Sequence, residues 1–296
     1  MLYDIALRIE YGYENSAEQS RHIVRLMPAD LPGEQRLVAG NLDYSPQPDE
    51  LENLTDFFGN RAVEVSFLQR HDEIVFTVNA RIERQSGDDV LDTSPKLARL
   101  AGEIASQKSV APWVPHHFVT ASARVPIDPE TTAFGAEHAA PDMSVVDCVS
   151  AIGKALNQQM RYDEEATTVD TPMIEAFRKR HGVCQDFSHV MIACLRGLGI
   201  PAGYVSGFLR TNPPPGSPRL EGADAMHAWV RAWCGTGMGW VEYDPTNAMF
   251  AGADHIVVAR GRDYGDVAPV KGVMRSYGEH ATKHQVDVVP VERTAP

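Results

Sequence analysis

Apolar and polar residues alternate through much of the first 90 positions. Between Tyr3 and Tyr13 the odd positions are apolar or aromatic and charged residues stand between them, and the same alternation returns at 63–67 and 74–82. A period of two is typical of a strand with one buried face, and segments rich in Pro, Gly and Asp separate these runs. The pattern predicts an antiparallel β domain over residues 1–90, folded as a sandwich or an open barrel.

Helical spacing replaces this alternation after residue 90. Ser94 followed by Pro95 predicts a capped helix start, and apolar positions at helical spacing continue to Ile104. Residues 111–142 show neither period, and we interpret them as an ordered connector. A second helical pattern runs from Met143 to Met160. The change from strands to helices predicts a second domain over residues 91–296, with a helical and irregular connector over 91–142.

The most informative segment begins at Gly182, where a third helical pattern follows. Its apolar positions are Cys184, Phe187, Met191, Cys194, Leu195 and Leu198. Cys184 would lie at the helix N-terminus, where unpaired N–H groups and the helix dipole stabilise a thiolate. The same N–H groups could bind an oxyanion, so the position suits a nucleophile. The alternative for Cys184 alone is a buried structural cysteine, because most cysteines are buried.

Two later segments predict a hairpin that carries a base and a carboxylate. Residues 224–234 and 239–247 are rich in aromatic residues and are separated by a Gly-rich turn; His227 opens the first segment and Asp244 closes the second. In an antiparallel pair these ends meet, so Asp244 can hydrogen-bond one ring nitrogen of His227 and fix its tautomer. The other nitrogen is then free for Cys184, which gives a nucleophile, a base and an orienting carboxylate.

Two other residues compete for these roles. His189 lies five positions after Cys184, about 140° around the helix, so it is expected to point away and to be packed or solvated. Glu242 shares strand parity with Asp244 but lies deeper in the strand, whereas Asp244 precedes Pro245 at the end of pairing. Asp244 is therefore the preferred orienting residue.

Composition and charge narrow the function classes. The net charge of −13 argues against nucleic acid and anionic membranes as partners, and no apolar run or basic leader predicts a membrane span or an export signal. Four scattered cysteines without a C-x-x-C pair favour reduced thiols and a cytoplasmic location. No cysteine or carboxylate cluster at zinc spacing accompanies His116-His117 or the segment Glu279-His-Ala-Thr-Lys-His284, so no metal is expected.

These residues resemble the transglutaminase-like superfamily of papain-like thiol enzymes, in particular its bacterial members described as cysteine proteases. The resemblance rests on Gly182-Val-Cys-Gln-Asp-Phe, Met226-His-Ala-Trp-Val and Trp240-Val-Glu-Tyr-Asp-Pro-Thr-Asn. It implies an α+β fold, in which an N-terminal antiparallel β-sandwich-like domain precedes a core with its catalytic helix packed on an antiparallel sheet. Residues 203–210, 256–259 and 286–291 are expected to extend that sheet.

The resemblance also implies site residues. Cys184 would be the nucleophile, His227 the base and Asp244 the orienting acid. Among cleft candidates, Gln185 is a possible second oxyanion donor, and Tyr162 would either approach the thiol or cap the core. Asp263 and Tyr264 would border the cleft, although a turn stabilised by Asp263 explains them equally well. Animal transglutaminases use calcium, but the chain has no calcium loop, so no cofactor is expected.

The expected chemistry is acyl transfer through a thioester, with a peptide or protein amide as substrate. If water resolves the thioester, the protein is a cysteine peptidase or amidase, which the resemblance favours. If a lysine amine resolves it, the protein is a protein-glutamine gamma-glutamyltransferase that cross-links proteins. A catalytically silent member that binds or scaffolds through its cleft is a third alternative. The oligomeric state cannot be derived from the sequence.

Overall fold

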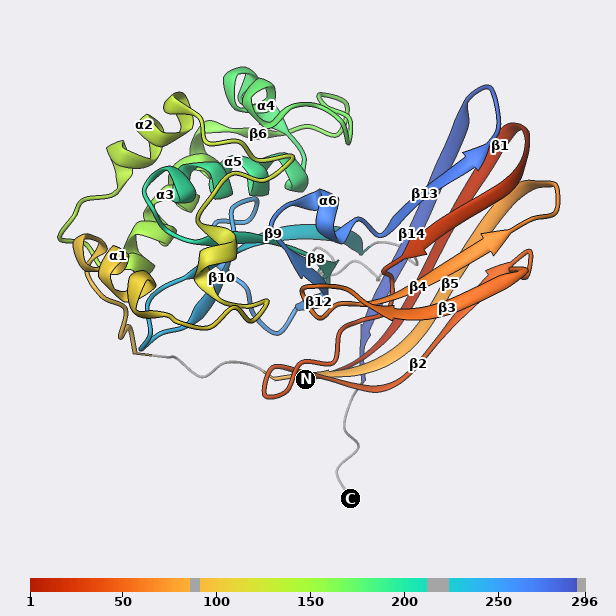
Figure 1. Cartoon of the computed structure of the whole chain (residues 1–296), viewed down its shortest axis with the longest axis horizontal. Helices are drawn as coiled ribbons and strands as arrows, with labels where there is room; N and C mark the ends of the chain where they lie inside the picture. The colour runs from red at the N-terminus through yellow and green to blue at the C-terminus, as the bar shows by residue number, and fades with distance from the viewer. Residues whose placement is uncertain (86–90, 212–223, 292–296) are drawn as a thin grey trace, which may run out of the picture.

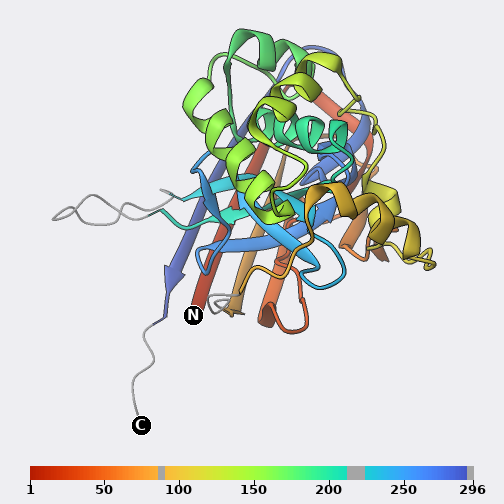
Figure 2. The same cartoon turned by 90° about the vertical axis from the view of Figure 1, so that its left-hand side faces the viewer.

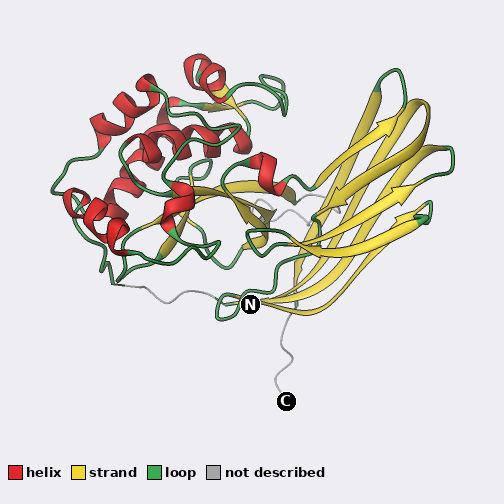
Figure 3. Cartoon of the chain, in the orientation of Figure 1, coloured by secondary structure: helices red, strands yellow, loops and turns green. Residues whose placement is uncertain are grey.

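The computed structural model of the chain describes residues 1–85, 91–211 and 224–291. Helices gather on one side of the molecule, and the long strands of a curled antiparallel sheet lie on the other (Figures 1 and 3). The predicted α+β class is confirmed. No helix within the described ranges is both long and apolar enough to cross a membrane.

The secondary structure divides into long strands, short strands and helices. The strands are β1 (Leu2–Val24), β2 (Gln35–Ser45), β3 (Glu50–Thr55), β4 (Arg61–Phe67), β5 (His71–Arg84), β6 (Arg161–Tyr162), β7 (His181–Gly182), β8 (Ala202–Leu209), β9 (Ala225–Trp233), β10 (Trp240–Asp244), β11 (Met249–Phe250), β12 (His255–Gly261), β13 (Val270–Arg275) and β14 (His280–Pro290). The helices are α1 (Leu97–Ser106), the 3-10 helix η1 (Pro115–Phe118), α2 (Pro129–His138), α3 (Val145–Gln159), α4 (Met173–Lys179), α5 (Cys184–Gly197) and α6 (Tyr264–Val267).

The larger sheet is organised around β1. The sheet order is β2-β5-β1-β4-β3, and β13 and β14 also pair with β1. Strands β5 and β14 flank the first half of β1, whereas β4 and β13 flank Ser20–Val24 after register shifts near Gly12 and Glu18. The alternating apolar residues from Tyr3 to Ile9 are buried, as the period of two predicts, and Tyr11 and Tyr13 are half-buried. A single strand with two successive sets of partners allows the sheet to curl.

The last strand does not lie where the sequence analysis placed it. Residues 286–291 were expected to extend the core sheet, and this prediction was wrong, because β14 pairs with β1 from Tyr3 to Tyr13. The first half of β1 has two free edges, and β5 covers only one of them. Asp224, next to β9, still contacts this strand, since its backbone N–H donates to Val286 at 3.2 Å. The division near residue 90 stays a prediction, but the larger sheet includes strands from both ends of the chain.

The smaller sheet carries the predicted site residues His227 and Asp244. Its order is β11-β10-β9-β8-β12, all antiparallel, so the predicted strands at 203–210 and 256–259 are confirmed as β8 and β12. Helix α5 packs on β8 and β9, and in Figure 2 the green helices lie above the cyan and blue strands. The other face meets the start of β2 and the segment before it. The Gln35 side chain, at the first position of β2, accepts from Val257 N–H at 2.9 Å and donates to Val257 O at 2.8 Å.

The helical connector differs in detail from its prediction. Ser94 does not cap the first helix, because α1 begins at Leu97 after Lys96; the Ser94 hydroxyl instead accepts a hydrogen bond from Val146 N–H at 3.2 Å, in the first turn of α3. The patternless segment 111–142 contains η1 and α2. Helix α2 shows weak segregation of apolar residues around its axis, which explains why periodicity did not reveal it.

Candidate active site

Residues close together in the sequence, from Gly182 to Asp186, form the start of α5. Val183 is extended and Cys184 is the first helical residue. The Asp186 carboxylate accepts hydrogen bonds from Val183 N–H at 2.9 Å and from the Thr167 hydroxyl at 2.6 Å, as an acidic N3 residue does when it caps a helix. A Cβ at Gly182 would lie 2.5 Å from that carboxylate, so only glycine allows this approach. These contacts fix Cys184 in the first turn.

The first turn also leaves backbone donors available. The N–H groups of Asp186 and Phe187 both donate to Val183 O, at 2.9 and 3.1 Å. Within the described part of the chain, the N–H groups of Cys184 and Gln185 have no acceptor. Unpaired N–H groups at a helix start bind negative charge, and the helix dipole adds to the effect. The site can therefore stabilise an anion close to the thiol.

His227 lies between Cys184 and Asp244. Its Nε2 is 2.7 Å from Asp244 Oδ2, so the predicted histidine–carboxylate hydrogen bond is present. Burial lowers the pKa of His227, but hydrogen bonds to Asp244 and to the Cys184 thiol raise it more, to about 10. Asp244 occupies Nε2, so the other ring nitrogen is the one left for the thiol. The structure thus brings the three predicted residues together.

Asp244 is held as a charged carboxylate. Its side chain is fully buried and accepts from His227, from His255 Nε2 at 3.1 Å, and from Asn247 Nδ2 at 2.7 Å, as well as from two backbone N–H groups of the following turn. Burial raises the pKa of Asp244, yet these hydrogen bonds hold it far below its usual value. Glu242, the alternative to Asp244, instead accepts from Trp229 Nε1 at 2.8 Å.

His255 is a site residue that sequence reasoning missed. It opens β12 and is 1% exposed. Its Nδ1 accepts a hydrogen bond from Gly252 N–H at 3.2 Å, so the neutral ring carries its proton on Nε2 and donates it to Asp244. The only sequence signal was a polar residue at the start of the predicted strand 256–259.

His227, Asp244 and His255 also form a group of possible metal ligands. One ligand atom from each lies within 4.8 Å of the others. A nitrogen must present a lone pair to bind a metal, whereas the His255 Nε2 proton points at Asp244 in this tautomer. The described geometry is therefore that of a hydrogen-bonded cluster, which we call the His–Asp–His cluster.

The other three cysteines differ from Cys184. Cys148, Cys194 and Cys234 are completely buried, whereas Cys184 is half-buried. Burial raises the pKa of Cys148 to about 11 and that of Cys194 to about 12, and it also raises the pKa of Cys234. Thiols with raised pKa values are poor nucleophiles at neutral pH. Only Cys184 combines access with a histidine partner among the four.

Tyr162 and Gln185 lie on either side of the segment that ends in Cys184. Tyr162 pairs with Gly182 in the short β6–β7 ladder and is 49% exposed, so the core-capping alternative was wrong. Burial raises its pKa to about 12, and the charge of Cys184 adds to the shift. Gln185 is buried, and its Nε2 donates to Val169 O at 3.1 Å. This side chain holds the 163–172 loop, and its second amide proton has no acceptor among the residues that the structure describes.

Asp263 and Tyr264 form the start of α6 and connect it by hydrogen bonds to neighbouring segments. The Asp263 carboxylate accepts from Gly265 N–H and from Arg124 N–H, both at 2.8 Å, which is the turn-stabilising role considered as an alternative. Tyr264 N–H donates to His189 Nε2 at 3.1 Å, and its ring contacts Tyr204. His189 was expected to be either packed or solvated, and it is buried. Burial lowers its pKa to about 4. It is a neutral packing residue.

Known proteins resemble the chain over its whole length. Residues 132–245 match the family model of the transglutaminase-like superfamily, and residues 3–83 match that of the bacterial transglutaminase-like N-terminal region. An uncharacterized protein of Mycobacterium tuberculosis is 33% identical, over 99% of this chain and 94% of its own length. An uncharacterized protein of Mycobacterium leprae is 30% identical, over 96% of both chains.

A solved structure shares the fold. It is described as a "putative cysteine protease" from Cytophaga hutchinsonii, with a TM-score of 0.75 and 21% identity, and the match covers 100% of this chain and 92% of that one. At this identity the likeness establishes the architecture alone. The two family models, which together match more than half of the chain, show that it belongs to the transglutaminase-like superfamily and carries the bacterial N-terminal region of that group.

Proposed function

We propose that the protein is a cysteine-dependent enzyme that hydrolyses peptide or amide bonds through a thioester. One observation carries the proposal: the Cys184 thiol, at the start of α5, faces a His227 ring whose Nε2 is fixed by Asp244 at 2.7 Å. An accessible thiol, a base and an orienting carboxylate are the parts that nucleophilic acyl transfer requires.

The first half-reaction forms the thioester. His227, whose pKa is raised to about 10, already holds the proton of the Cys184 thiol at neutral pH, and Cys184 Sγ attacks the substrate carbonyl carbon as a thiolate. The negative charge that develops on the carbonyl oxygen is stabilised by the free backbone N–H of Cys184. His227 then donates the proton to the leaving amine as the carbon–nitrogen bond breaks. Asp244 stays ionised and holds the imidazole orientation.

The second half-reaction returns the thiol. His227 takes a proton from water, the resulting hydroxide attacks the thioester carbonyl, and the carbon–sulfur bond breaks to release a carboxylic acid. In this proposal Tyr162 and Tyr264 border the substrate cleft, and Gln185 and Asp263 position the loops around it. A lysine amine in place of water would instead give a cross-linked product.

Digestion of a peptide library, analysed by mass spectrometry with and without a primary amine, tests the proposal. Hydrolysis predicts cleaved or deamidated peptides in both samples, whereas a cross-linking transferase predicts incorporation of the amine. A protein that changes no peptide under either condition would be the silent binding member, and the proposal would be abandoned.

Two cysteine variants on one helix provide the matched control. Cys184→Ala should abolish turnover, by about 10⁴-fold or more, because a thioester cannot form without the thiol. Cys194→Ala lies ten residues later in α5 and is fully buried, so it should retain turnover. Equal activity of Cys184→Ala and the parent would refute the assignment.

We also propose a cytoplasmic location as part of this function. All four cysteines are unpaired, and a thiol nucleophile must stay reduced to act. Detection of the protein only in the periplasmic fraction of its host would contradict this part of the proposal.

A further inference from the structure

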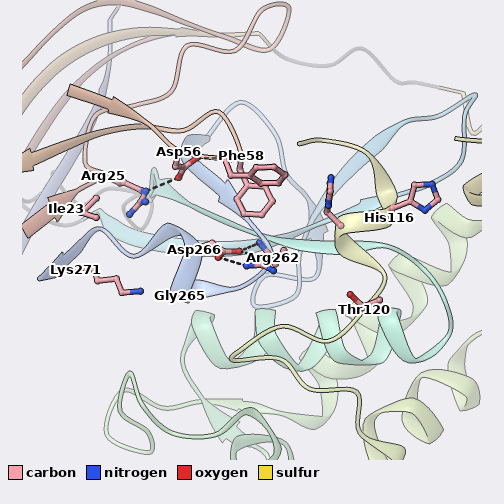
Figure 4. Close-up of a pocket in the computed structure, with 12 residues that line it drawn as sticks. Ile23, Arg25, Asp56, Phe58, His116, Thr120, Arg262, Gly265, Asp266 and Lys271 are labelled. Atoms are coloured by element: carbon pink, nitrogen blue, oxygen red, sulfur yellow. Dashed lines mark hydrogen bonds and ion pairs between the residues drawn. The ribbon is translucent and has the colours of Figure 1, made fainter. Parts of the chain in front are cut away.

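Two cavities lie where the larger sheet meets the rest of the molecule, and their charged residues differ in pairing. The cavity in Figure 4 has a volume of about 520 Å³. Its two arginines already have carboxylate partners: Arg25 lies 3.1 Å from Asp56, and Arg262 lies 2.9 Å from Asp266. The guanidinium charges in this cavity are therefore balanced from within the chain.

The second cavity, which we call the Arg231 pocket, has a volume of about 410 Å³. It lies between the segment before β2, the β3–β4 turn, the connector and the face of the smaller sheet opposite α5. Its walls include Leu31, Phe58, Trp113, Arg231, Trp240 and Arg260. Trp113 is 65% exposed, whereas Arg231 is only 7% exposed. A cavity of this size accommodates a small organic molecule.

The Arg231 side chain has no hydrogen-bond acceptor or ion-pair partner within the described part of the chain. Its Nε is enclosed without a partner, and its guanidinium stacks on the Trp240 ring at 4.2 Å. Glu242 lies directly opposite it on β10, but the oxygens of that carboxylate are engaged by Trp229 Nε1 at 2.8 Å and by Arg260 at 2.5 Å. The Glu242 carboxylate, the nearest candidate to pair with the Arg231 side chain, is therefore already engaged by other residues.

The charge balance around the pocket leaves one positive charge in excess. Two buried arginines, Arg84 and Arg231, and the half-buried Arg260 lie near two carboxylates, those of Glu34 and Glu242. The remaining charged lining residues, Asp30 and Arg61, carry opposite charges that cancel in the sum. Burial and the neighbouring charge of Arg260 lower the pKa of Arg231 to about 9. A buried, uncompensated cation is unfavourable, so an anion that enters the pocket gains a partner which the protein does not supply.

We propose that the Arg231 pocket binds a small organic monocarboxylate with an aromatic or apolar body. A guanidinium stacked on an indole ring keeps its edge free, and that edge matches the two oxygens of a planar carboxylate. Phe58, Trp113 and Trp240 provide apolar contact for the body of the ligand. Asp30 and Glu34 also line the pocket and disfavour ions of higher negative charge, so a carboxylate is preferred over a phosphate.

Calorimetric titration of the full-length protein tests this binding with a matched pair of probes. N-acetyl-phenylalanine carries the carboxylate, and N-acetyl-phenylalanine amide has the same body without the charge. The titrations use the Cys184→Ala variant, so the result does not depend on the proposed hydrolysis. The acid should bind at least tenfold more tightly than the amide, and inorganic phosphate should bind more weakly than the acid.

Arginine variants locate the site. Arg231→Gln should weaken binding of the acid at least tenfold. Arg231→Lys keeps the positive charge but loses the two parallel N–H donors of the guanidinium, so it should weaken binding less. Arg36→Gln makes the same charge change on an exposed part of the larger sheet and should leave binding unchanged. Equal binding of acid and amide overturns the proposal even if Arg231→Gln fails to fold. Unchanged affinity in a folded Arg231→Gln variant, or tighter binding of phosphate, also overturns it.

Discussion

Cys184 and the three buried cysteines offer a direct comparison of thiol environments within one chain. Iodoacetamide at neutral pH should alkylate Cys184 at least tenfold faster than Cys148, Cys194 or Cys234, because those three are buried and their pKa values are raised. Peptide mapping after timed quenching measures the four rates. Similar slow labelling of all four would mean that the Cys184 thiol is not activated.

His255 is expected to act as a positioning residue through Asp244. His255→Ala removes one donor to the carboxylate, so the negative charge of Asp244 interacts more strongly with His227. Turnover should fall by about tenfold, roughly 1.4 kcal/mol of barrier, because the imidazole is held less firmly. The alkaline limb of the pH–rate profile should also move to higher pH.

The conservative variant His255→Gln controls for a merely structural effect. It can still donate a hydrogen bond from its amide, so it should recover part of the turnover and restore the position of the alkaline limb. A His255→Ala enzyme with an unmoved pH profile would show that this histidine serves packing alone.

The sequence predicted the positions of Cys184, His227 and Asp244 because local patterns constrain each of them. Helix periodicity and Gly182 place the cysteine, and hairpin pairing brings the other two together. His255 could not be predicted in the same way, since its contact with Asp244 depends on β12 joining the far side of β8. Arg231 was missed because the carboxylate opposite it is taken by Trp229 of the same strand and by Arg260 of β12.

At the scale of elements, the first turn of α5 depends on one capping side chain. Asp186→Ala removes the acceptor of Val183 N–H and should lower the free energy of unfolding by about 1–2 kcal/mol. It should also slow alkylation of Cys184, because the turn that holds the thiol becomes less ordered. Urea denaturation measures the first effect and timed labelling the second.

A capping residue of another helix provides the control. Asp128 caps α2 by accepting from Glu130 N–H at 2.7 Å, far from the thiol in sequence. Asp128→Ala should cost a similar free energy without changing the labelling rate. If the two variants slow labelling equally, the effect of Asp186 reflects global stability and not the geometry of the α5 start.

Element prediction worked where one period dominated a segment. The alternating runs became β1, β4 and β5, and the long helical patterns became α3 and α5. Strands β2 and β3 expose many of their residues, so burial imposes little pattern on them. The partner of β14 was assigned wrongly because an alternating strand pattern specifies which face is buried and does not specify which neighbour it joins.

For the whole molecule, His227 and Asp244 predict how stability depends on pH. The folded pKa of His227 is raised to about 10 from its usual value of about 6.5, so its contribution to stability is fully present below about pH 6.5 and is lost as pH rises through 10. The folded pKa of Asp244 is lowered, so its contribution is present above about 4 and is lost in acid. Stability from this pair is therefore greatest between about pH 4 and 6.5.

Thermal unfolding from pH 3 to 10.5 measures this dependence. The parent should lose stability on both sides of the window, and the loss between pH 6.5 and 10 should be smaller in His227→Gln, which has no group that titrates there. Identical alkaline slopes in the two proteins would show that other groups control the decline.

The return of β14 to β1 has a consequence for how the protein is made. A strand at one end of the chain pairs along eleven positions with a strand at the other end, from Tyr3 opposite Pro290 to Tyr13 opposite His280. During synthesis β1 leaves the ribosome before β14, so one of its edges stays open until β14 has been translated. Contacts of such long sequence separation also slow folding. The helix that carries Cys184 is thus synthesised before the sheet at the start of the chain can be completed.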